Sequence, residues 1–269
     1  MVFENKQNMK ILINVLLCFC SIAAFGQIKE ISRNTVDAHL FKLDKLGSFY
    51  FVNKNILTKT DKNLKTLCTW DNYSHGEISF VDVSDPLRIL MYYADFNTLL
   101  FLDKYLTELR DPVSLDDINI YNSGAIAVAQ QGGFWVYNYQ NSQIVRVDQN
   151  LNIAQKGVDL YSQIKDSEIQ ELIVSTDYIL LQTNNKSIIV LDKFANFYTK
   201  FVLKSETPIC IDNEKLFYIE DKALIIYDLA KNKLFSIDIP ISSVLDIEVS
   251  GDNLYVLSEK SLITFKILY

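Results

Sequence analysis

Histidine, cysteine, glycine and proline are all scarce in this sequence. Its 269 residues include two His, four Cys, eight Gly and four Pro. The two histidines, His39 and His75, have no partner at the spacing that a zinc or copper centre requires. Glycine-rich phosphate loops, dinucleotide fingerprints and the G-x-S-x-G turn of a nucleophilic serine are absent from the sequence. We therefore expect no catalytic residue, no cofactor and no metal.

A basic surface is lacking as well. Lys and Arg number 26 against 33 Asp and Glu, which gives a formal net charge of −7. Nucleic acids and anionic lipids both attract proteins through a basic face. We therefore expect neither of them as the main partner of this chain.

The cysteines do not form a disulfide framework. Cys18 and Cys20 lie in the N-terminal apolar segment, where the preceding residues are bulkier than those before a lipidated cysteine. Only Cys68 and Cys210 remain beyond that segment. We expect two buried thiols, with a single Cys68–Cys210 bridge as the alternative.

The N-terminus has the order of features of a secretory signal peptide. Lysines precede an apolar run at residues 11–25, and the small residues Ala24 and Gly26 stand at the −3 and −1 positions of a cleavage site. The run is shorter than the ~20 apolar residues of a membrane span, and an uncleaved anchor is the alternative. We expect a signal peptide at residues 1–26 and a single domain at residues 27–269.

Two landmarks repeat along the rest of the chain. In the first, an apolar run ends in an aspartate, and an apolar residue follows three positions later. These aspartates are Asp61, Asp103, Asp148, Asp192 and Asp228. We expect each of them to form a turn in which its carboxylate accepts hydrogen bonds from backbone N–H groups.

The second landmark is a turn followed by an apolar, aromatic-rich strand. Its copies begin at Gly47, Asp85, Gly132, Asp177, Asn213 and Gly251. This spacing corresponds to a period of about 40 residues, which is typical of propeller blades with four short strands each. The sequence therefore predicts an all-β fold, a six-bladed β-propeller of four-stranded antiparallel blades.

The second repeat illustrates the expected strands. From the inside outward they are residues 78–81, 87–92, 98–102 and 106–110. Helical periodicity is absent beyond the signal peptide, apart from short turns expected within residues 115–122 and 162–171.

The sixth repeat is one strand short. Its expected strands are residues 244–249, 254–257 and 262–267, after which the sequence stops at Tyr269. Propellers commonly cover such an open edge with a strand from the other terminus. We therefore expect residues 28–32 to complete the last blade.

The landmarks resemble those of the NHL and YVTN-type β-propellers. The repeats at residues 44–50 and 85–90 are also similar to exported propeller-like proteins of Bacteroidota. The resemblance covers residues 27–269 and implies the fold without implying a chemistry. The repeated Gly-His and Trp-Asp pairs of WD40 blades are missing, although Trp70-Asp71 occurs once.

Aromatic residues are concentrated in a few loops. In a propeller, the loops that enter each blade share one face with the turns between second and third strands. Aromatic side chains with polar groups are typical of interface hot spots. The candidate binding residues are Trp70, Tyr73, His75, Tyr92, Tyr93, Phe96, Tyr137 and Tyr139. The alternative is that about half of them pack between blades.

Carboxylates offer a second kind of site. The candidates to line a central channel from innermost strands are Asp116, Asp117, Glu171, Asp246 and Glu248. An enzyme acting on glycans or small molecules would bring at least two of them together with shifted pKa values. A scaffold would instead show an aromatic rim without such convergence.

These features favour an exported, non-enzymatic scaffold that binds an envelope protein or protein complex in the periplasm or at the outer membrane. A role in envelope or outer-membrane complex biogenesis follows by analogy with other propellers. Because no membrane span is expected after cleavage, any membrane association would be peripheral, through the partner. The alternatives are a channel enzyme and a cell-surface adhesin or sensor.

Cleavage after Gly26 fixes the N-terminus of the exported protein. Protein recovered from the envelope of its source cell should begin at Gln27 and have the mass of residues 27–269. Intact mass spectrometry and N-terminal sequencing measure both. A mass that retains residues 1–26 would contradict cleavage.

Overall fold

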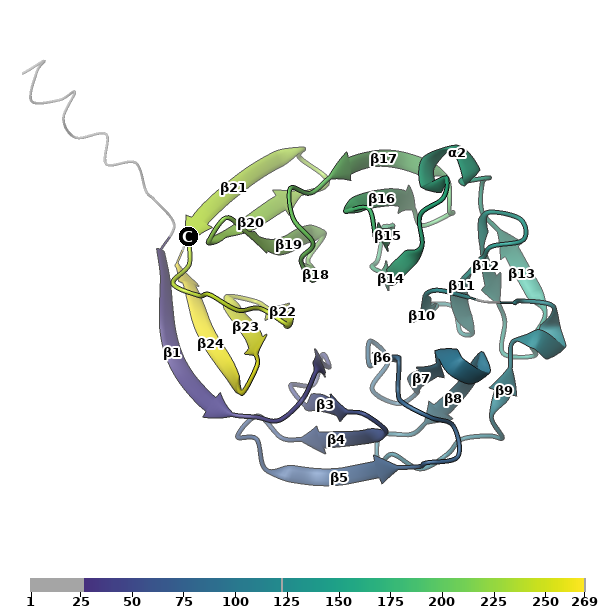
Figure 1. The fold of residues 1–269 in the computed structure, drawn as a ribbon, viewed down its shortest axis with the longest axis horizontal. Coiled ribbons are helices and arrows are strands. Elements are labelled where there is room, and N and C mark those ends of the chain that lie inside the picture. The colour runs from purple at the N-terminus through teal and green to yellow at the C-terminus, as the bar shows by residue number, and fades with distance from the viewer. Residues whose placement is uncertain (1–26, 122, 269) are drawn as a thin grey trace, which may run out of the picture.

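The computed structural model describes residues 27–121 and 123–268, and the predicted signal peptide lies outside them. Within these residues the strands form six four-stranded sheets, arranged around a central axis (Figure 1). The pairings within each sheet are antiparallel, as at β2–β3 and β3–β4. The predicted six-bladed β-propeller is therefore confirmed. We number the sheets as blades 1 to 6 in chain order.

The strands of each blade run outward from the axis. Blade 1 contains β2 (Leu40–Leu43), β3 (Phe49–Asn53), β4 (Ile56–Thr60) and β5 (Thr66–Asp71). Blade 2 contains β6 (Phe80–Asp82), β7 (Ile89–Tyr93), β8 (Thr98–Leu102) and β9 (Val113–Ser114). Blade 3 contains β10 (Ile126–Val128), β11 (Phe134–Asn138), β12 (Gln143–Val147) and β13 (Ile153–Lys156).

The second half of the ring repeats this order. Blade 4 contains β14 (Ile169–Val174), β15 (Tyr178–Thr183), β16 (Ser187–Asp192) and β17 (Phe197–Val202). Blade 5 contains β18 (Ile209–Asp212), β19 (Lys215–Glu220), β20 (Ala223–Asp228) and β21 (Lys233–Asp238). Blade 6 contains β22 (Asp246–Ser250), β23 (Asn253–Ser258), β24 (Ser261–Leu268) and β1 (Gln27–Thr35). The helical turns are η1 (Ala94–Phe96), η2 (Asp116–Ile118) and α2 (Tyr161–Ile164).

The hydrophobic core is divided among the spaces between blades. Trp135 of blade 3 and Leu181 of blade 4, for example, belong to one buried cluster. In the described part of the chain, every other adjacent pair of blades shares such a cluster. Inner positions are accordingly buried on both sheet faces, as throughout β7, whereas β21 on the outer wall is mostly exposed. A blade therefore has no core of its own and depends on both neighbours.

The repeated aspartates form the expected turns. The carboxylate of Asp148 accepts hydrogen bonds from the backbone N–H groups of Asn150 and Asn152 at 2.8 and 2.9 Å. These bonds hold a turn in which Leu151 has a left-handed φ of 67°. The same pair of bonds is made by Asp61, Asp103 and Asp192. The turn at Asp228 differs, since its carboxylate accepts a single backbone bond.

The outer strand of blade 2 differs from the prediction. Residues 106–110 make a single bridge, between Leu102 and Glu108, and the ladder resumes only at β9. Pro112 lies between these two pairings. Proline has no N–H to donate to a ladder and is tolerated at interruptions of an edge strand. The predicted continuous strand is therefore split into two short pairings.

The N-terminal strand closes the ring, as predicted. β1 pairs with β24 from Gln27 opposite Leu268 to Thr35 opposite Ser261, so it extends beyond the expected residues 28–32. Figure 1 shows β1, in purple, along the outer edge of the yellow β24. A bulge near Ile31 bends the strand along this edge. The pairing satisfies backbone groups that β24 would otherwise expose.

Deleting residues 27–35 should destabilise the whole ring. The paired strand contributes about 0.5–1.5 kcal/mol for each net hydrogen bond, and its loss also uncovers the edge of β24. Urea unfolding followed by circular dichroism should show a lower midpoint than for the chain that begins at Gln27. The control is Ile31→Ala, because Ile31 is 54% exposed and lies at the bulge. An unchanged midpoint in the shortened chain would contradict closure by β1.

Candidate functional site

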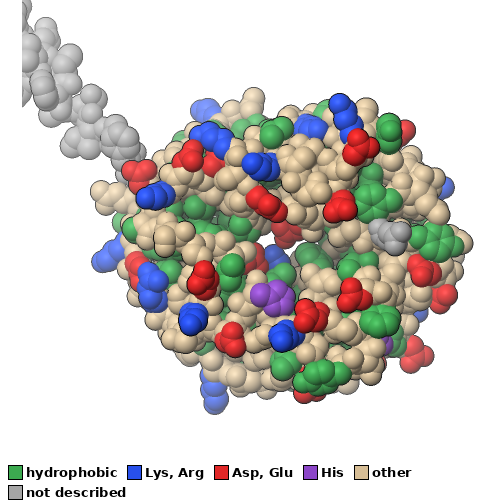
Figure 2. Space-filling view, in the orientation of Figure 1, with side chains coloured by type: hydrophobic (Ala, Val, Ile, Leu, Met, Phe, Trp, Pro, Cys, Tyr) green, Lys and Arg blue, Asp and Glu red, His purple; other side chains and the backbone are tan. Residues whose placement is uncertain are grey.

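The ring has two faces that carry different loops. We call the entry face the one with the blade-to-blade connections and the turns between second and third strands. The opposite side, the pocket face, has the first-to-second and third-to-fourth turns. Both assignments follow from the antiparallel strand order within each blade. Figure 2 shows a central opening where acidic, basic and histidine side chains gather.

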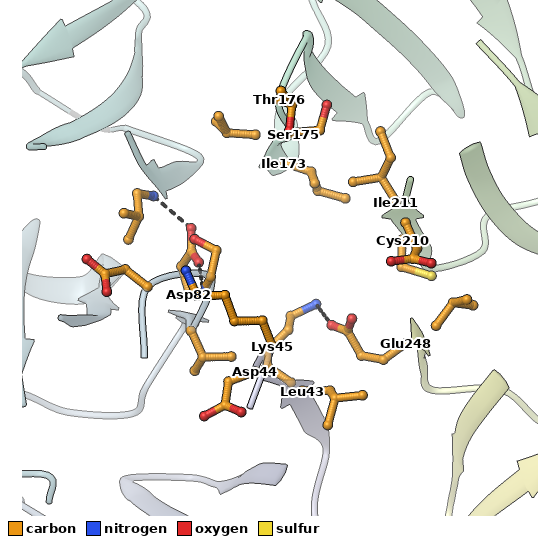
Figure 3. Close-up of a pocket in the computed structure, with 18 of the residues that line it drawn as sticks. Leu43, Asp44, Lys45, Asp82, Ile173, Ser175, Thr176, Cys210, Ile211 and Glu248 are labelled. Atoms are coloured by element: carbon orange, nitrogen blue, oxygen red, sulfur yellow. Dashed lines mark hydrogen bonds and ion pairs between the residues drawn. The ribbon is translucent and has the colours of Figure 1, made fainter. Parts of the chain in front are cut away.

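A cavity of about 1100 Å³ occupies the channel on the pocket face. It is lined by the ends of the innermost strands and by the turns that follow them, so every blade contributes to its wall. Figure 3 shows labelled side chains of this wall, among them Asp82, Ile173, Cys210 and Glu248. The fold thus builds the cavity from segments far apart in sequence.

One lysine joins three carboxylates in the channel. Lys42 Nζ lies 3.3 Å from Glu171 Oε1, 3.3 Å from Glu248 Oε1 and 3.8 Å from Asp246 Oδ1. Asp246 and Glu248 alternate along β22, which places both on one face of the strand. Lys42 comes from blade 1 and Glu171 from blade 4, on the other side of the ring. We call these four residues the Lys42 cluster.

Burial and mutual attraction shift the pKa values of the residues in the Lys42 cluster. The Lys42 side chain is only 12% exposed. Burial opposes its charge, but attraction to the three carboxylates is stronger and raises the pKa of Lys42 well above its usual value. Burial also raises the pKa of Glu171 and Asp246, against the attraction of Lys42, and raises the pKa of Glu248 to about 8. Because one ammonium cannot compensate three buried carboxylates, the cluster as a unit retains a proton near neutral pH.

Three of the five predicted channel carboxylates therefore converge, namely Glu171, Asp246 and Glu248. Asp116 and Asp117 do not, and the expectation that they lie on an innermost strand is wrong. They are exposed in η2 on the entry face, and Asp116 accepts a hydrogen bond from Asn97 Nδ2 at 2.6 Å. The innermost strand of blade 3 starts only at Ile126, after this connection has ended.

Sequence reasoning missed Lys42, the residue that organises the cluster. The available signal was a lysine inside the otherwise apolar segment of residues 40–43. Such a lysine at the centre of a propeller is buried and requires an acidic partner. The identity of that partner depends on how the ring closes, which the local sequence does not contain.

Both cysteines of the domain are free, and the expectation that both are buried is wrong for Cys68. Cys210 is 4% exposed and lies in the cavity wall, whereas Cys68 is only partly buried. Burial, reinforced by the charge of Glu248, raises the pKa of the Cys210 thiol well above its ordinary value. Cys210 therefore remains a protonated thiol and not a nucleophile.

The predicted binding loops of blades 1 and 2 meet on the entry face. Trp70 Nε1 donates a hydrogen bond to Tyr93 Oη at 3.3 Å, and the ring of His75 lies 5.3 Å from the ring of Tyr93. Tyr93 is completely buried and Tyr92 is 2% exposed. These two tyrosines therefore pack within the ring, whereas Trp70 and His75, which contact Tyr93, are partly exposed.

The aromatic pair of blade 3 also has a packing role. The rings of Tyr137 and Tyr139 form an edge-to-face contact with centroids 4.7 Å apart. Tyr137 is 1% exposed, and Tyr139 Oη accepts a hydrogen bond from the backbone N–H of Ile169 at 2.7 Å. This bond links blade 3 to blade 4. Little of the surface of the two tyrosine side chains is then accessible to a binding partner.

Exposed aromatic side chains are nevertheless present in several loops of the entry face. Of the predicted residues, Tyr73 is 79% exposed and Phe96 is 55% exposed. Sequence reasoning missed Tyr121 and Tyr161, which are 39% and 64% exposed in the next two blade-to-blade connections. We call these four residues the entry-face patch. The exposed acidic residues of the same loops are Asp71, Glu77, Asp95, Asp116, Asp117, Asp159, Asp166 and Glu168.

Two kinds of feature are absent from the described residues. Across residues 27–121 and 123–268, no helix is long and apolar enough to span a membrane. In the same part of the chain, no group of three or more His, Cys, Asp and Glu side chains is arranged to hold a metal ion.

Glu248→Gln should remove part of the pH dependence of stability. The folded protein holds the Glu248 proton more tightly than the unfolded chain, because its pKa rises from 4.5 to about 8. The stability of the wild type should therefore fall as the pH rises from about 5 to about 8. Over this range, the free energy of unfolding of Glu248→Gln should rise relative to that of the wild type by up to about 1.4 kcal/mol per pH unit. Urea denaturation across this range measures the difference. A difference that stays constant with pH would contradict the raised pKa.

Comparison with known proteins finds a likeness of fold. No family model matches the sequence, and neither does any curated protein. Virginiamycin B lyase from Staphylococcus aureus matches with a TM-score of 0.60 and 12% identity, over 90% of this chain and 100% of that one. The Neurospora crassa Pan2 WD40 domain matches with a TM-score of 0.59 and 10% identity, over 89% and 95%. BamB from Moraxella catarrhalis matches with a TM-score of 0.53 and 10% identity, over 89% and 99%. The chain is thus similar to β-propeller proteins of several kinds.

Proposed function

We propose that the protein is an exported, non-enzymatic binding propeller whose entry-face patch docks an envelope protein or protein complex. The observation that carries this proposal is the exposure of Tyr73, Phe96, Tyr121 and Tyr161 on one face of a rigid ring. Large aromatic side chains supply most of the binding energy at protein interfaces, and they do so best when they are held in place before binding.

Part of the patch is preformed. Gly76, with a φ of 79°, lies so close to Phe96 that a Cβ atom there would be 3.3 Å from the phenylalanine ring. The loop that carries Tyr73 is therefore packed directly against η1. His75 adds a second contact to this support through its ring contact with buried Tyr93. Such support reduces the conformational entropy that these loops and side chains lose when a partner binds.

The surroundings of the patch indicate the chemistry of the partner. Acidic side chains, including Asp71, Asp95 and Asp159, are exposed in the loops that carry the aromatic residues. A complementary partner surface would present arginine or lysine, and arginine would also stack on the exposed rings. We expect a protein with a basic, partly apolar contact surface.

The predicted signal peptide supports a partner in the periplasm or at the outer membrane. In its most specific form, the proposal is a role in envelope or outer-membrane complex biogenesis, by analogy with other exported propellers. Any contact with the membrane would then be made through the partner.

An enzyme is the second candidate, because Glu171 and Glu248 converge in a cavity with raised pKa values. In most glycoside hydrolases two such carboxylates flank the substrate bond. Here the ammonium of Lys42 lies 3.3 Å from each of them and occupies the space between. The arrangement favours binding over hydrolysis. Cleavage of a glycan that is abolished by Glu171→Gln would establish the enzyme instead.

Alanine substitutions in the entry-face patch should weaken binding of the partner. The test uses quantitative affinity purification of the tagged protein from its own envelope, comparing the wild type with Tyr73→Ala/Phe96→Ala and with Tyr161→Ala. Truncation of an interface hot spot weakens binding by about 2 kcal/mol or more, so the captured partner should fall at least tenfold. All three residues are well exposed, and stability should hardly change.

The matched control is Tyr105→Ala. Tyr105 is 66% exposed and lies in the third-to-fourth turn of blade 2, on the pocket face. Partner capture should be unchanged in this variant. Equal capture by the wild type and the patch variants, with thermal unfolding intact, would contradict docking at the entry face.

A further inference from the structure

The cavity on the pocket face has a strongly one-sided charge. Among its lining residues, eight carboxylates stand against two lysines. A cleft with one sign of charge and low-dielectric walls concentrates ligands of the opposite charge. The cavity is also large enough for a small organic molecule, since such sites measure about 300–1000 Å³. Charge and volume together indicate an organic cation as the occupant.

The deepest carboxylates are not fully compensated. Glu171, Asp246 and Glu248 share one ammonium, and in the described residues no other cationic side chain lies within ion-pair distance of them. A second observation concerns the wall beside Glu248. Cys210 is 96% buried there, and its thiol makes no hydrogen bond with the residues that the structure describes. The cluster thus lacks a second positive charge, and the thiol beside it is left without a partner.

The wall is layered along the axis. Along three innermost strands, apolar residues of the cavity wall come after the level of the Lys42 cluster, at Leu43, Ile173 and Ile211. Figure 3 labels these three side chains. Partly exposed carboxylates come next toward the mouth, at Asp212 and Glu214. With a rise of about 3.3 Å per residue, the strands separate the inner and outer carboxylates by roughly 7 Å or more. The order is acidic, apolar, acidic.

We propose that this cavity binds a ligand with two or more alkylammonium groups joined by a short aliphatic chain. One ammonium lies beside Glu171 and Glu248, the methylene chain contacts Ile173 and Ile211, and a further ammonium meets the carboxylates at the mouth. Lys42 supplies the chemical precedent, because its own alkylammonium is held by the same carboxylates. A divalent metal is not the occupant proposed, since the described residues contain no metal-holding group.

Alkylammonium groups have two natural sources, free polyamines and the lysine side chains of a peptide. Both would use the same contacts in the cavity. A free polyamine requires only the cavity, whereas a peptide requires an open path for its backbone as well. The two sources are therefore distinguished by comparing spermidine with trilysine as probes.

Binding should be coupled to proton release. Glu248 is faced by Lys42 from β2, Glu171 from β14, Cys210 from β18 and Asp246 from its own strand. Beyond these, His39 acts on Asp246 and Asp82 acts on Glu171. An ammonium beside Glu248 favours its ionised form, whose pKa in the free protein is about 8. Affinity should therefore rise with pH from about 6 to about 8.5.

The experiment is isothermal titration calorimetry of the purified protein with spermidine and, separately, with trilysine at low ionic strength. We expect saturable one-to-one binding of at least one probe. Glu171→Gln should weaken it at least tenfold, and Glu248→Gln should abolish its rise with pH. Asp212→Asn, at the mouth, should weaken it several-fold and serves as the second test if Glu171→Gln fails to fold. Binding of trilysine alone would identify peptide lysines as the source.

The control is Asp117→Asn, which removes the same charge from an exposed site on the entry face. Its affinity should remain within twofold of the wild type. Absence of saturable binding for both probes would overturn the proposal. Equal weakening by Asp117→Asn and by the cavity variants would also overturn it, because the effect would then be that of net charge alone. Loss of partner capture in the entry-face variants would leave this result unaffected.

Discussion

The burial of both faces of every sheet is the constraint on which the rest of this structure depends. A four-stranded blade with apolar side chains on both sides needs two neighbours, and a closed ring provides them without an end. The contact between blades 6 and 1 has the smallest cluster of fully buried residues among the described contacts, centred on Phe41 and Leu262. It is reinforced by the edge-to-face pair of Phe49 and Tyr255 and by the ion pairs of Lys42. Ring closure thus combines apolar, aromatic and ionic contacts.

Much of the fold could be predicted because its signals are local. The turn at Asp148 is determined by a carboxylate and the N–H groups two and four residues later, so the sequence alone indicates it. The strand that completes the last repeat was also predictable, since an open sheet edge can be protected in only a few ways, and pairing with a terminal strand is one of them. The outer strand of blade 2 was predicted wrongly because Pro112 interrupts the hydrogen-bonded ladder. The pattern of apolar residues does not reveal such an interruption.

The candidate site was less accessible to sequence reasoning. Glu171, Asp246 and Glu248 were identified from their places on innermost strands, but Lys42 was not, since its neighbours come from blades 4 and 6. Among the aromatic residues, pattern alone did not separate buried Tyr93 from exposed Phe96. The two lie three residues apart, and the difference between them is produced by the packing of the adjacent blade-to-blade loop.

The pairing of β1 with β24 also has a consequence for biosynthesis. The strand that completes blade 6 precedes the other described strands in the chain, and its partner, Ser261–Leu268, follows them. A nascent chain therefore cannot finish the ring before β24 has been synthesised, and a chain that terminates before β24 can never finish it. Such incomplete products would display a free strand at one end and an unpaired sheet edge at the other. An unpaired sheet edge can pair with a strand of another chain, so the topology makes incomplete copies prone to aggregation.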